Sequence, residues 1–188
     1  MAQPAILLDR DGVINVNRPD DVKSWEEFEW IPGSLQAISE LTNLGWPIVV
    51  LTNQRAIAQG TLTVQGLERI HQHMQESVEQ AGGRITRIFS CACAEQGRNC
   101  PCEKPKPFML LQAKRELDLD LERSYLIGDK ATDIEFGKRG KTKTVLVLTG
   151  EGCGPRGVWA LGSIEPDCIQ RDLAHAARWI IQQELSQG

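Results

Sequence analysis

Short apolar runs alternate with stretches of helical periodicity along most of the chain. The apolar runs predict buried strands at residues 4–8, 47–51, 85–89, 124–127 and 142–148. Between them, apolar residues recur every three or four positions, which predicts helices over residues 33–44, 63–80, 107–117, 132–139 and 170–185. Because strands alternate with helices, the pattern indicates an α/β fold, with a parallel sheet covered by helices on both faces.

The same alternation predicts the domain organisation. The sequence contains no internal repeat, low-complexity tract or linker, so we expect a single domain over residues 1–188. That length is enough for one sizeable hydrophobic core. Residues 149–169 are rich in glycine and proline and are expected to form a loop.

Composition narrows the functional classes. Hydrophobic residues make up 41% of the chain and charged residues 24%, which is ordinary for a globular protein. The net charge of −4 argues against a non-specific nucleic-acid binder. No apolar run approaches the roughly 20 residues that span a bilayer, and no secretory leader is recognisable. We therefore expect a cytoplasmic protein with no nucleic-acid or membrane partner. An anionic substrate still fits, because a metal ion can reverse the local charge.

Polar side chains follow three of the predicted strands at the point where each strand ends. Asp9 and Asp11 leave the first strand, Thr52 and Asn53 leave the second, and Asp129 leaves the fourth. A single aspartate at such a position is as often a helix cap or a turn residue. Because the carboxyl ends of parallel strands meet at one crevice, three such ends together favour a binding site. Carboxylate clusters suit Mg²⁺.

The pair Asp9 and Asp11 suits phosphoryl transfer. A carboxylate held by Mg²⁺ can be a nucleophile that forms an acyl phosphate, and a second carboxyl group can protonate the leaving oxygen. Two like charges so close are expected to raise one of the two pKa values. The side chain of Arg10 between them is expected to point away from both.

Positive charge for binding phosphate is offered just before the predicted helix at residues 107–117. Lys104 and Lys106 lie there, and the N-terminus of a helix itself favours anions. Taken singly, each lysine is more typical of a solvated loop. Pro105 and Pro107 stiffen the segment, which favours lysines held in fixed positions.

Four of the six cysteines fall within residues 91–102, as Cys91, Cys93, Cys100 and Cys102. In a reducing compartment such a cluster favours a metal over disulfides, and four thiolates are typical ligands of tetrahedral Zn²⁺. Reduced loop thiols or a redox switch are the alternatives. Four protein ligands would leave no open position, so a zinc ion here would be structural.

Four segments together resemble the motifs of the haloacid dehalogenase (HAD) superfamily. These segments are Asp9–Val13, Leu51–Gln54, Lys104–Pro107 and Gly128–Asp133. They occur in the family's order and cover roughly residues 5–150. The resemblance implies a Rossmann-like sheet without a large cap domain, and a phosphatase that works through an aspartyl-phosphate intermediate.

The resemblance also implies roles for the reacting groups. Asp9 would attack phosphorus, and Asp11 would be the general acid and then the base that activates water. Thr52 and Lys104 would hold the phosphoryl oxygens. Lys104 fits the family lysine better than Lys106 does.

A Mg²⁺ site is implied by the same motifs. Its ligands would be Asp9, Asp129 and the backbone carbonyl of Asp11, with Lys130 adding a second backbone ligand. Asp133 would orient these groups without binding the ion.

Within the superfamily, the chain resembles the small heptose-bisphosphate and histidinol-phosphate phosphatases. In those proteins a cysteine loop binds zinc through Cys, His, Cys and Cys, and Cys93 stands here at the histidine position. Thiolate is a competent replacement, so the resemblance implies Mg²⁺ and Zn²⁺ as cofactors, with the zinc loop at residues 91–102.

Substrate contacts are implied at Asn17, Arg18, Asp20, Asn53, Gln54, Arg55 and Glu103. Heptose-bisphosphate members usually carry arginine at the position of Glu103, and this reversal of charge argues against a grip on a second phosphate there. Arg55 is a candidate to supply the missing charge. We expect a monomeric phosphatase acting on a small phosphorylated metabolite, with a heptose bisphosphate first and histidinol phosphate second. A HAD-fold binding protein of impaired activity is the third reading.

His71 and His73 lie two residues apart on the predicted helix at residues 63–80. Positions two apart do not share a helix face. We expect both to be surface or boundary residues.

Overall fold

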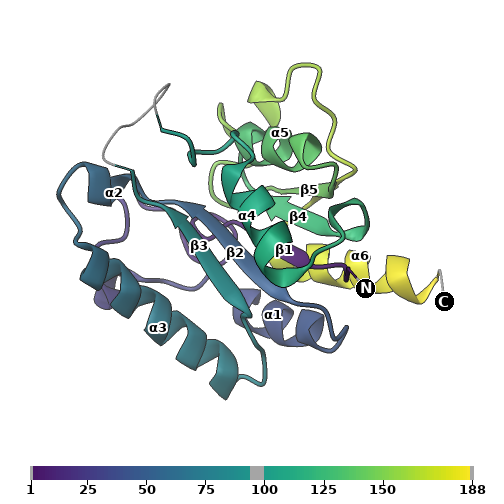
Figure 1. The fold of residues 1–188 in the computed structure, drawn as a ribbon, viewed down its shortest axis with the longest axis horizontal. Coiled ribbons are helices and arrows are strands. Elements are labelled where there is room, and N and C mark those ends of the chain that lie inside the picture. The colour runs from purple at the N-terminus through teal and green to yellow at the C-terminus, as the bar shows by residue number, and fades with distance from the viewer. Residues whose placement is uncertain (1, 94–99, 187–188) are drawn as a thin grey trace.

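A computed structural model describes residues 2–93 and 100–186 of the chain. These residues form a six-stranded parallel sheet in the order β3-β2-β1-β4-β5-β6 (Figure 1). The strands are β1 (Ile6–Leu8), β2 (Ile48–Asn53), β3 (Arg87–Cys91), β4 (Tyr125–Gly128), β5 (Lys143–Val147) and β6 (Cys168–Gln170). The predicted α/β fold is therefore confirmed.

Helices cover both faces of the sheet. They are α1 (Ser34–Thr42), α2 (Arg55–Ala58), α3 (Val64–Gln80), α4 (Phe108–Leu117), α5 (Ala131–Arg139) and α6 (Leu173–Leu185). Apolar residues of α1, α3 and α6 pack on one face, and those of α4 and α5 pack on the other (Figure 1). Strand β1 shows why both faces need cover: Ile6 and Leu8 belong to the first core and Leu7 to the second, as the two-residue period of a strand requires.

Two short elements were not predicted, and several predicted boundaries differ from the observed ones by one to three residues. No element was predicted at helix α2, and the edge strand β6 lies where the expected loop at 149–169 meets the expected helix at 170–185, because neither contains an apolar run of useful length. Strand β3 lies at Arg87–Cys91 rather than 85–89, since it pairs with the end of β2 as far as Asn53. Helix α6 begins at Leu173 rather than 170, because Asp172 caps it by accepting a hydrogen bond from the His175 N–H at 2.9 Å.

The strand order determines where the functional side chains meet. The chain runs outward from β1 through β2 to β3, then returns to the other side of β1 with β4 and continues outward to β6. The connections after β1 and β4 therefore leave the sheet in opposite directions, and a crevice opens between them. Ligands of open α/β sheets bind in such a crevice, beyond the carboxyl ends of the strands.

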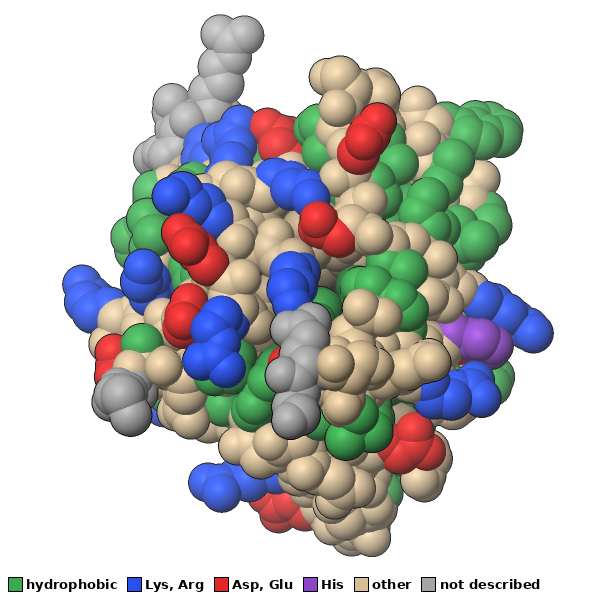
Figure 2. All heavy atoms as spheres, turned by 90° about the vertical axis from the view of Figure 1, so that its right-hand side faces the viewer, with side chains coloured by type: hydrophobic (Ala, Val, Ile, Leu, Met, Phe, Trp, Pro, Cys, Tyr) green, Lys and Arg blue, Asp and Glu red, His purple; other side chains and the backbone are tan. Residues whose placement is uncertain are grey.

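Two further observations concern the surface. None of the helices in the described part of the chain is long and apolar enough to cross a membrane. Figure 2 shows one face of the molecule, on which basic and acidic side chains are interspersed rather than gathered by sign. This distribution agrees with the small net charge of −4.

Candidate active site

Three buried carboxylates converge at the crevice. Asp9 follows β1, and its N–H continues the ladder of β4 by donating to the Ile127 carbonyl at 3.0 Å. Asp129 follows β4, and Asp133 lies in the first turn of α5. One oxygen of each carboxylate lies within 4.8 Å of the others, and the three residues are 0 to 6% exposed. The structure thus brings together the strand ends that the sequence indicated.

Lys104 neutralises part of this cluster. Its Nζ lies 2.9 Å from Asp9 Oδ1, 2.6 Å from Asp133 Oδ1 and 3.0 Å from the Leu51 carbonyl. The backbone N–H of Lys104 donates to Asn53 Oδ1 at 3.1 Å, which fixes the loop against the end of β2. Lys106 is directed elsewhere, because its ammonium donates to the Cys100 carbonyl.

A second ammonium, that of Lys130, lies on the other side of the cluster. Its Nζ is 3.2 Å from Asp129 Oδ1 and 3.9 Å from Asp9 Oδ2. Three carboxylates thus face two ammonium groups, and negative charge is in excess. Burial raises the pKa of Asp9, and burial with the nearby Asp133 and Asp9 raises the pKa of Asp129 to about 7. Burial lowers the pKa of Lys104, but Asp133 and Asp9 more than offset it, so the net pKa is raised.

A divalent cation fits this arrangement. Oxygen donors, burial and excess negative charge are the conditions that favour Mg²⁺. Both oxygens of Asp133 already accept hydrogen bonds, Oδ1 from Lys104 Nζ and Oδ2 from the Lys130 N–H at 3.0 Å. Asp9 and Asp129 are therefore better placed to be ligands, with Asp133 holding the two lysine segments in position.

Asp11 occupies a different environment from Asp9, and here one expectation is wrong. Arg10 does not point away: its Nη2 donates to both oxygens of Asp11, at 2.9 Å each. Asn15 Nδ2 and Gln54 Nε2 donate to the same carboxylate, also at 2.9 Å. Burial would raise the pKa of Asp11, but the Arg10 charge and these hydrogen bonds lower it overall. One of these two carboxyl groups was expected to have a raised pKa, and it is Asp9.

A pocket of about 330 Å³ opens over these groups. Of the residues expected to contact substrate, Asn17, Arg18, Asn53 and Arg55 line it together with Asp9, Asp11, Lys104, Lys130 and Asp133. The remaining expected contacts do not lie on this wall. Thr52 and Gln54 are buried, with Gln54 Nε2 donating to Thr52 Oγ1 at 2.9 Å. Asp20 pairs with Lys23, and Glu103 lines a separate small hollow beside the cysteines.

The pocket also has walls that the sequence analysis missed. Glu151 and Arg156, from the loop after β5, line it, as do Asp21 and Thr132. The Glu151 N–H donates to Asp129 Oδ2 at 2.8 Å, and Glu151 Oε1 lies 3.8 Å from Arg156 Nη1. The sequence did contain a hint of their position, because this loop follows the carboxyl end of the strand predicted at 142–148.

Two glycines allow the backbone to approach Asp129. Gly12 has φ +92° and Gly150 has φ +56°, conformations that residues with a side chain rarely adopt. A Cβ atom on Gly12 would lie 2.2 Å from Asp129 Oδ2, and one on Gly150 would lie 2.3 Å from the same atom. Backbone alone therefore encloses this carboxylate on two sides.

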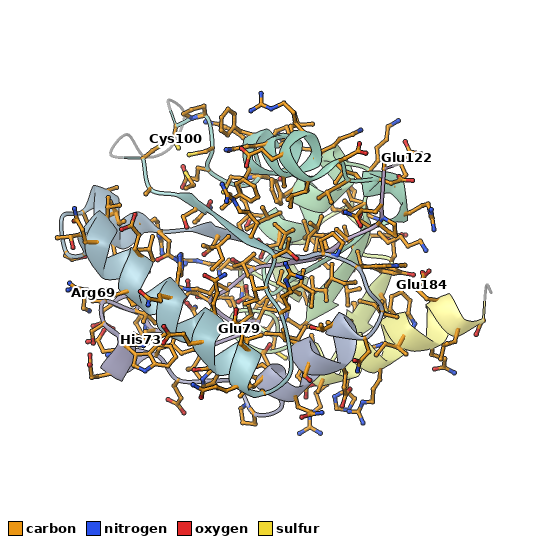
Figure 3. All side chains as sticks on the ribbon, turned by 60° about the horizontal axis from the view of Figure 1, so that its bottom comes forward. Arg69, His73, Glu79, Cys100, Glu122 and Glu184 are labelled. Carbon is orange, nitrogen blue, oxygen red and sulfur yellow. The ribbon has the colours of Figure 1, made fainter. Side chains whose placement is uncertain are left out.

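The four clustered cysteines meet at the end of β3. Cys91 Sγ lies 3.3 Å from Cys100 Sγ, Cys93 Sγ lies 3.1 Å from Cys102 Sγ, and the Sγ atoms of Cys100 and Cys102 are 3.6 Å apart. All four are free thiols whose sulfurs lie within 4.8 Å of one another, a spacing suited to one metal ion. Figure 3 shows Cys100 at the edge of the molecule, where the loop re-enters the described structure. Residues 94–99 of the expected zinc loop lie outside the described residues.

Fold and site together define a phosphatase of the HAD-like hydrolases. Residues 101–176 match the HAD-hydrolase-like family. The chain is 36% identical over 184 residues to a D-glycero-beta-D-manno-heptose-1,7-bisphosphate 7-phosphatase of Pseudomonas aeruginosa, covering 97% of this chain and all of that one. It is 42% identical over 147 residues to the enzyme of that name from Neisseria meningitidis, covering 78% of each chain.

A solved structure agrees with these relatives. The D,D-heptose 1,7-bisphosphate phosphatase of B. bronchiseptica, in complex with magnesium and phosphate, superposes with a TM-score of 0.88 at 35% identity, covering 96% of this chain and 99% of that one. The chain belongs to the HAD-like phosphatase family that these proteins represent.

Proposed function

We propose that the protein is a Mg²⁺-dependent phosphatase that removes the 7-phosphate of D-glycero-D-manno-heptose 1,7-bisphosphate. The observation that carries the proposal is the contact of buried Asp9 with Lys104, with Asp129 and Asp133 beside them at one crevice. The names of relatives that match most of the chain support the choice of substrate. We take the chain to act as one domain, because a single sheet joins strands from both of its halves.

The first chemical step joins the protein to the phosphoryl group. A carboxylate oxygen of Asp9 attacks phosphorus, the bond from phosphorus to the sugar oxygen breaks, and Asp11 donates a proton to that oxygen. Lys104 lines the pocket 2.9 Å from Asp9 and would bind phosphoryl oxygens. We assign the Thr52 hydroxyl the same role, although here it is buried behind the pocket wall and accepts a hydrogen bond from Gln54. The charge of Lys104 opposes the repulsion between the attacking carboxylate and the anionic substrate.

The second step releases phosphate. Asp11, now a carboxylate, accepts a proton from water as the water oxygen attacks the phosphorus of the aspartyl phosphate, and the bond to Asp9 breaks. Asp11 is then protonated again for the next turnover, so the proton balance closes. The contacts of Asp11 with Arg10, Asn15 and Gln54 lower its pKa, which favours the carboxylate that this second step requires and disfavours the protonated form that the first step requires.

Mg²⁺ would be held by Asp9, Asp129 and backbone carbonyls of Asp11 and Lys130. When bound, it would neutralise charge on the phosphoryl oxygens and on the two carboxylates. Asp133 keeps Lys104 and the Lys130 backbone in place by accepting a hydrogen bond from each.

A second phosphate on the substrate would meet arginines at the pocket. Arg18, Arg55 and Arg156 all line it, and their charges are not consumed by the buried carboxylate cluster. Glu103 is not on the wall of this pocket; it lines an adjoining hollow that shares Asn53 and Arg55 with it. These placements support a bisphosphate over a substrate with a single phosphate.

The experiment that tests the proposal is a comparison of kcat/KM values with Mg²⁺ present. The panel contains heptose 1,7-bisphosphate, sugar monophosphates, other sugar bisphosphates and histidinol phosphate. We expect the heptose bisphosphate to have the highest kcat/KM and to lose only the 7-phosphate. A higher value for histidinol phosphate would replace the substrate proposed here, and no turnover across the panel would favour a binding protein.

Mg²⁺ affinity is expected to depend on pH. The pKa of Asp129 is raised to about 7 in the metal-free protein, and an aspartate binds Mg²⁺ only as the carboxylate. Protons therefore compete with the ion below that pH, and affinity should fall by up to about tenfold per pH unit. Calorimetric titration of metal-stripped protein at several pH values measures this. An affinity that stays constant between about pH 5.5 and 8 would contradict the assignment.

We also propose that the four cysteines bind one structural Zn²⁺. Metal analysis of never-chelated protein should give about one zinc per chain, and Cys100→Ser should reduce that content and lower the melting temperature. Cys153→Ser is the matched control, because Cys153 is exposed and outside the cluster, and it should change neither. Zinc-free protein with an unchanged melting temperature would refute the site.

A further inference from the structure

The Arg10 side chain is fully buried although it lies between two aspartates of the site. Its Nη2 donates to both oxygens of Asp11, and its Nη1 lies 3.2 Å from His71 Nε2. Among the residues that the structure describes, Arg10 Nε has no hydrogen-bond partner. The guanidinium is therefore held at two points, by a carboxylate of the active site and by a histidine of α3.

His71, expected as a surface or boundary residue, is buried in the structure. It is 8% exposed and lies on the apolar side of α3, beside Ile70 and Met74. A guanidinium can only donate, so Nε2 must be the acceptor and the proton of the neutral ring is assigned to Nδ1. Burial and the Arg10 charge lower the pKa of His71 to about 3, in agreement with a neutral ring.

A neutral acceptor at this position has a specific consequence. A carboxylate there would compete with Asp11 for the buried cation, whereas an apolar side chain would leave one end of the guanidinium unpaired. His71 fixes Arg10 and leaves its charge to Asp11. The other donors to Asp11, Asn15 and Gln54, are uncharged amides.

We propose that His71 is a positioning residue for Asp11. By fixing Arg10, it fixes the direction in which the Asp11 carboxyl group faces the leaving oxygen. The Asp11 side chain is 19% exposed and lines the pocket, so this direction is open to substrate. The inference rests on the proposed phosphatase mechanism, in which Asp11 passes a proton to that oxygen as its bond to phosphorus breaks.

Two substrates whose leaving groups differ in their need for a proton distinguish a positioning role of His71 from a role in packing alone. A poor leaving group such as phenolate needs the proton, whereas 4-nitrophenolate departs readily without it. We expect His71→Phe to lower kcat/KM about 30-fold for phenyl phosphate and less than about 3-fold for 4-nitrophenyl phosphate. The roughly 30-fold loss corresponds to part of the rate gain that a general acid supplies. His71→Gln keeps an acceptor oxygen and should restore most of the phenyl phosphate activity.

His73→Phe is the matched control. His73 lies on the same helix but is half exposed and stacks on Trp25, with ring centroids 5.4 Å apart (Figure 3). This variant should keep the wild-type ratio of the two kcat/KM values. The ratio is measured on one preparation with both substrates, so it does not depend on the fraction of folded enzyme.

Equal losses on both substrates in His71→Phe, or no rescue by His71→Gln, would overturn the inference. If His71→Phe yields no folded protein, Arg10→Lys takes its place, since one ammonium cannot reach both His71 and Asp11. An unchanged ratio in Arg10→Lys would equally overturn it. Failure of the wild-type enzyme on sugar phosphates would instead reject the proposed function, because the aryl phosphate ratio does not depend on the natural substrate.

Discussion

Asp9→Asn is expected to lower kcat by at least about 1,000-fold, because an amide cannot form the aspartyl phosphate. Folding should survive the change. Asparagine keeps an oxygen that can accept from the Arg10 N–H, and Lys104 keeps Asp133 as its partner at 2.6 Å. Steady-state kinetics with Mg²⁺ and a melting curve of the same preparation measure both effects.

Asp118→Asn is the matched control for this variant. Asp118 ends α4 in a left-handed conformation with φ +50°, which asparagine adopts readily. It does not line the pocket, so kcat should remain at the wild-type value. Retention of more than about a tenth of wild-type activity by Asp9→Asn would exclude Asp9 as the nucleophile.

Lys104→Met is expected to lower both activity and stability. The variant leaves the buried carboxylates of Asp9 and Asp133 without their shared cation, and breaking a buried ion pair in this way costs about 3–5 kcal/mol of unfolding free energy. Activity should fall at least about 100-fold, because phosphoryl oxygens lose their nearest positive charge. Urea denaturation and steady-state kinetics measure the two losses.

The stability loss in Lys104→Met should grow with pH. Without the cation, the carboxylates keep protons to higher pH in the folded state than in the unfolded state. The folded variant then binds more protons, so its unfolding free energy falls as pH rises. The deficit relative to wild type should be larger at about pH 8 than at about pH 5.5.

Lys106→Met is the matched control for Lys104→Met. It removes an ammonium from the same motif, but one that donates to the Cys100 carbonyl rather than to the carboxylates. It should leave the activity near that of wild type and show no such pH-dependent deficit. Equal losses of activity and unfolding free energy in the two variants would mean that the contacts of Lys104 with Asp9 and Asp133 are not the cause of the effect.

The sequence was sufficient to predict which strand ends meet. Apolar runs locate the strands, and parallel strands bring Asp9 and Asp129 to one edge whatever the details of packing. The environment of Asp11 was not predictable in the same way. Side-chain alternation directs Arg10 to the other face from its neighbours, but its length allows the guanidinium to turn back to Asp11.

Other misses have identifiable causes. His71 is four residues after Leu67 and three before Met74, so the helical period of α3 already placed it on the buried side. The expectation for His71 rested instead on its spacing from His73, which says only that the two side chains do not share a helix face. Glu151 and Arg156 belong to a loop without periodicity, and their contribution to the pocket depends on how that loop folds back over Asp129.

The position of β1 in the sheet also affects how the enzyme is made. β1 pairs with β2 on one side and with β4 on the other, although β4 is synthesised long after β1. A nascent chain that has formed only β1, β2 and β3 therefore exposes the open edge of a strand that is fully buried at the end of folding. Asp129 follows β4, so the catalytic groups come together only when β4 docks at that edge, and phosphatase activity therefore reports that this long-range pairing has formed.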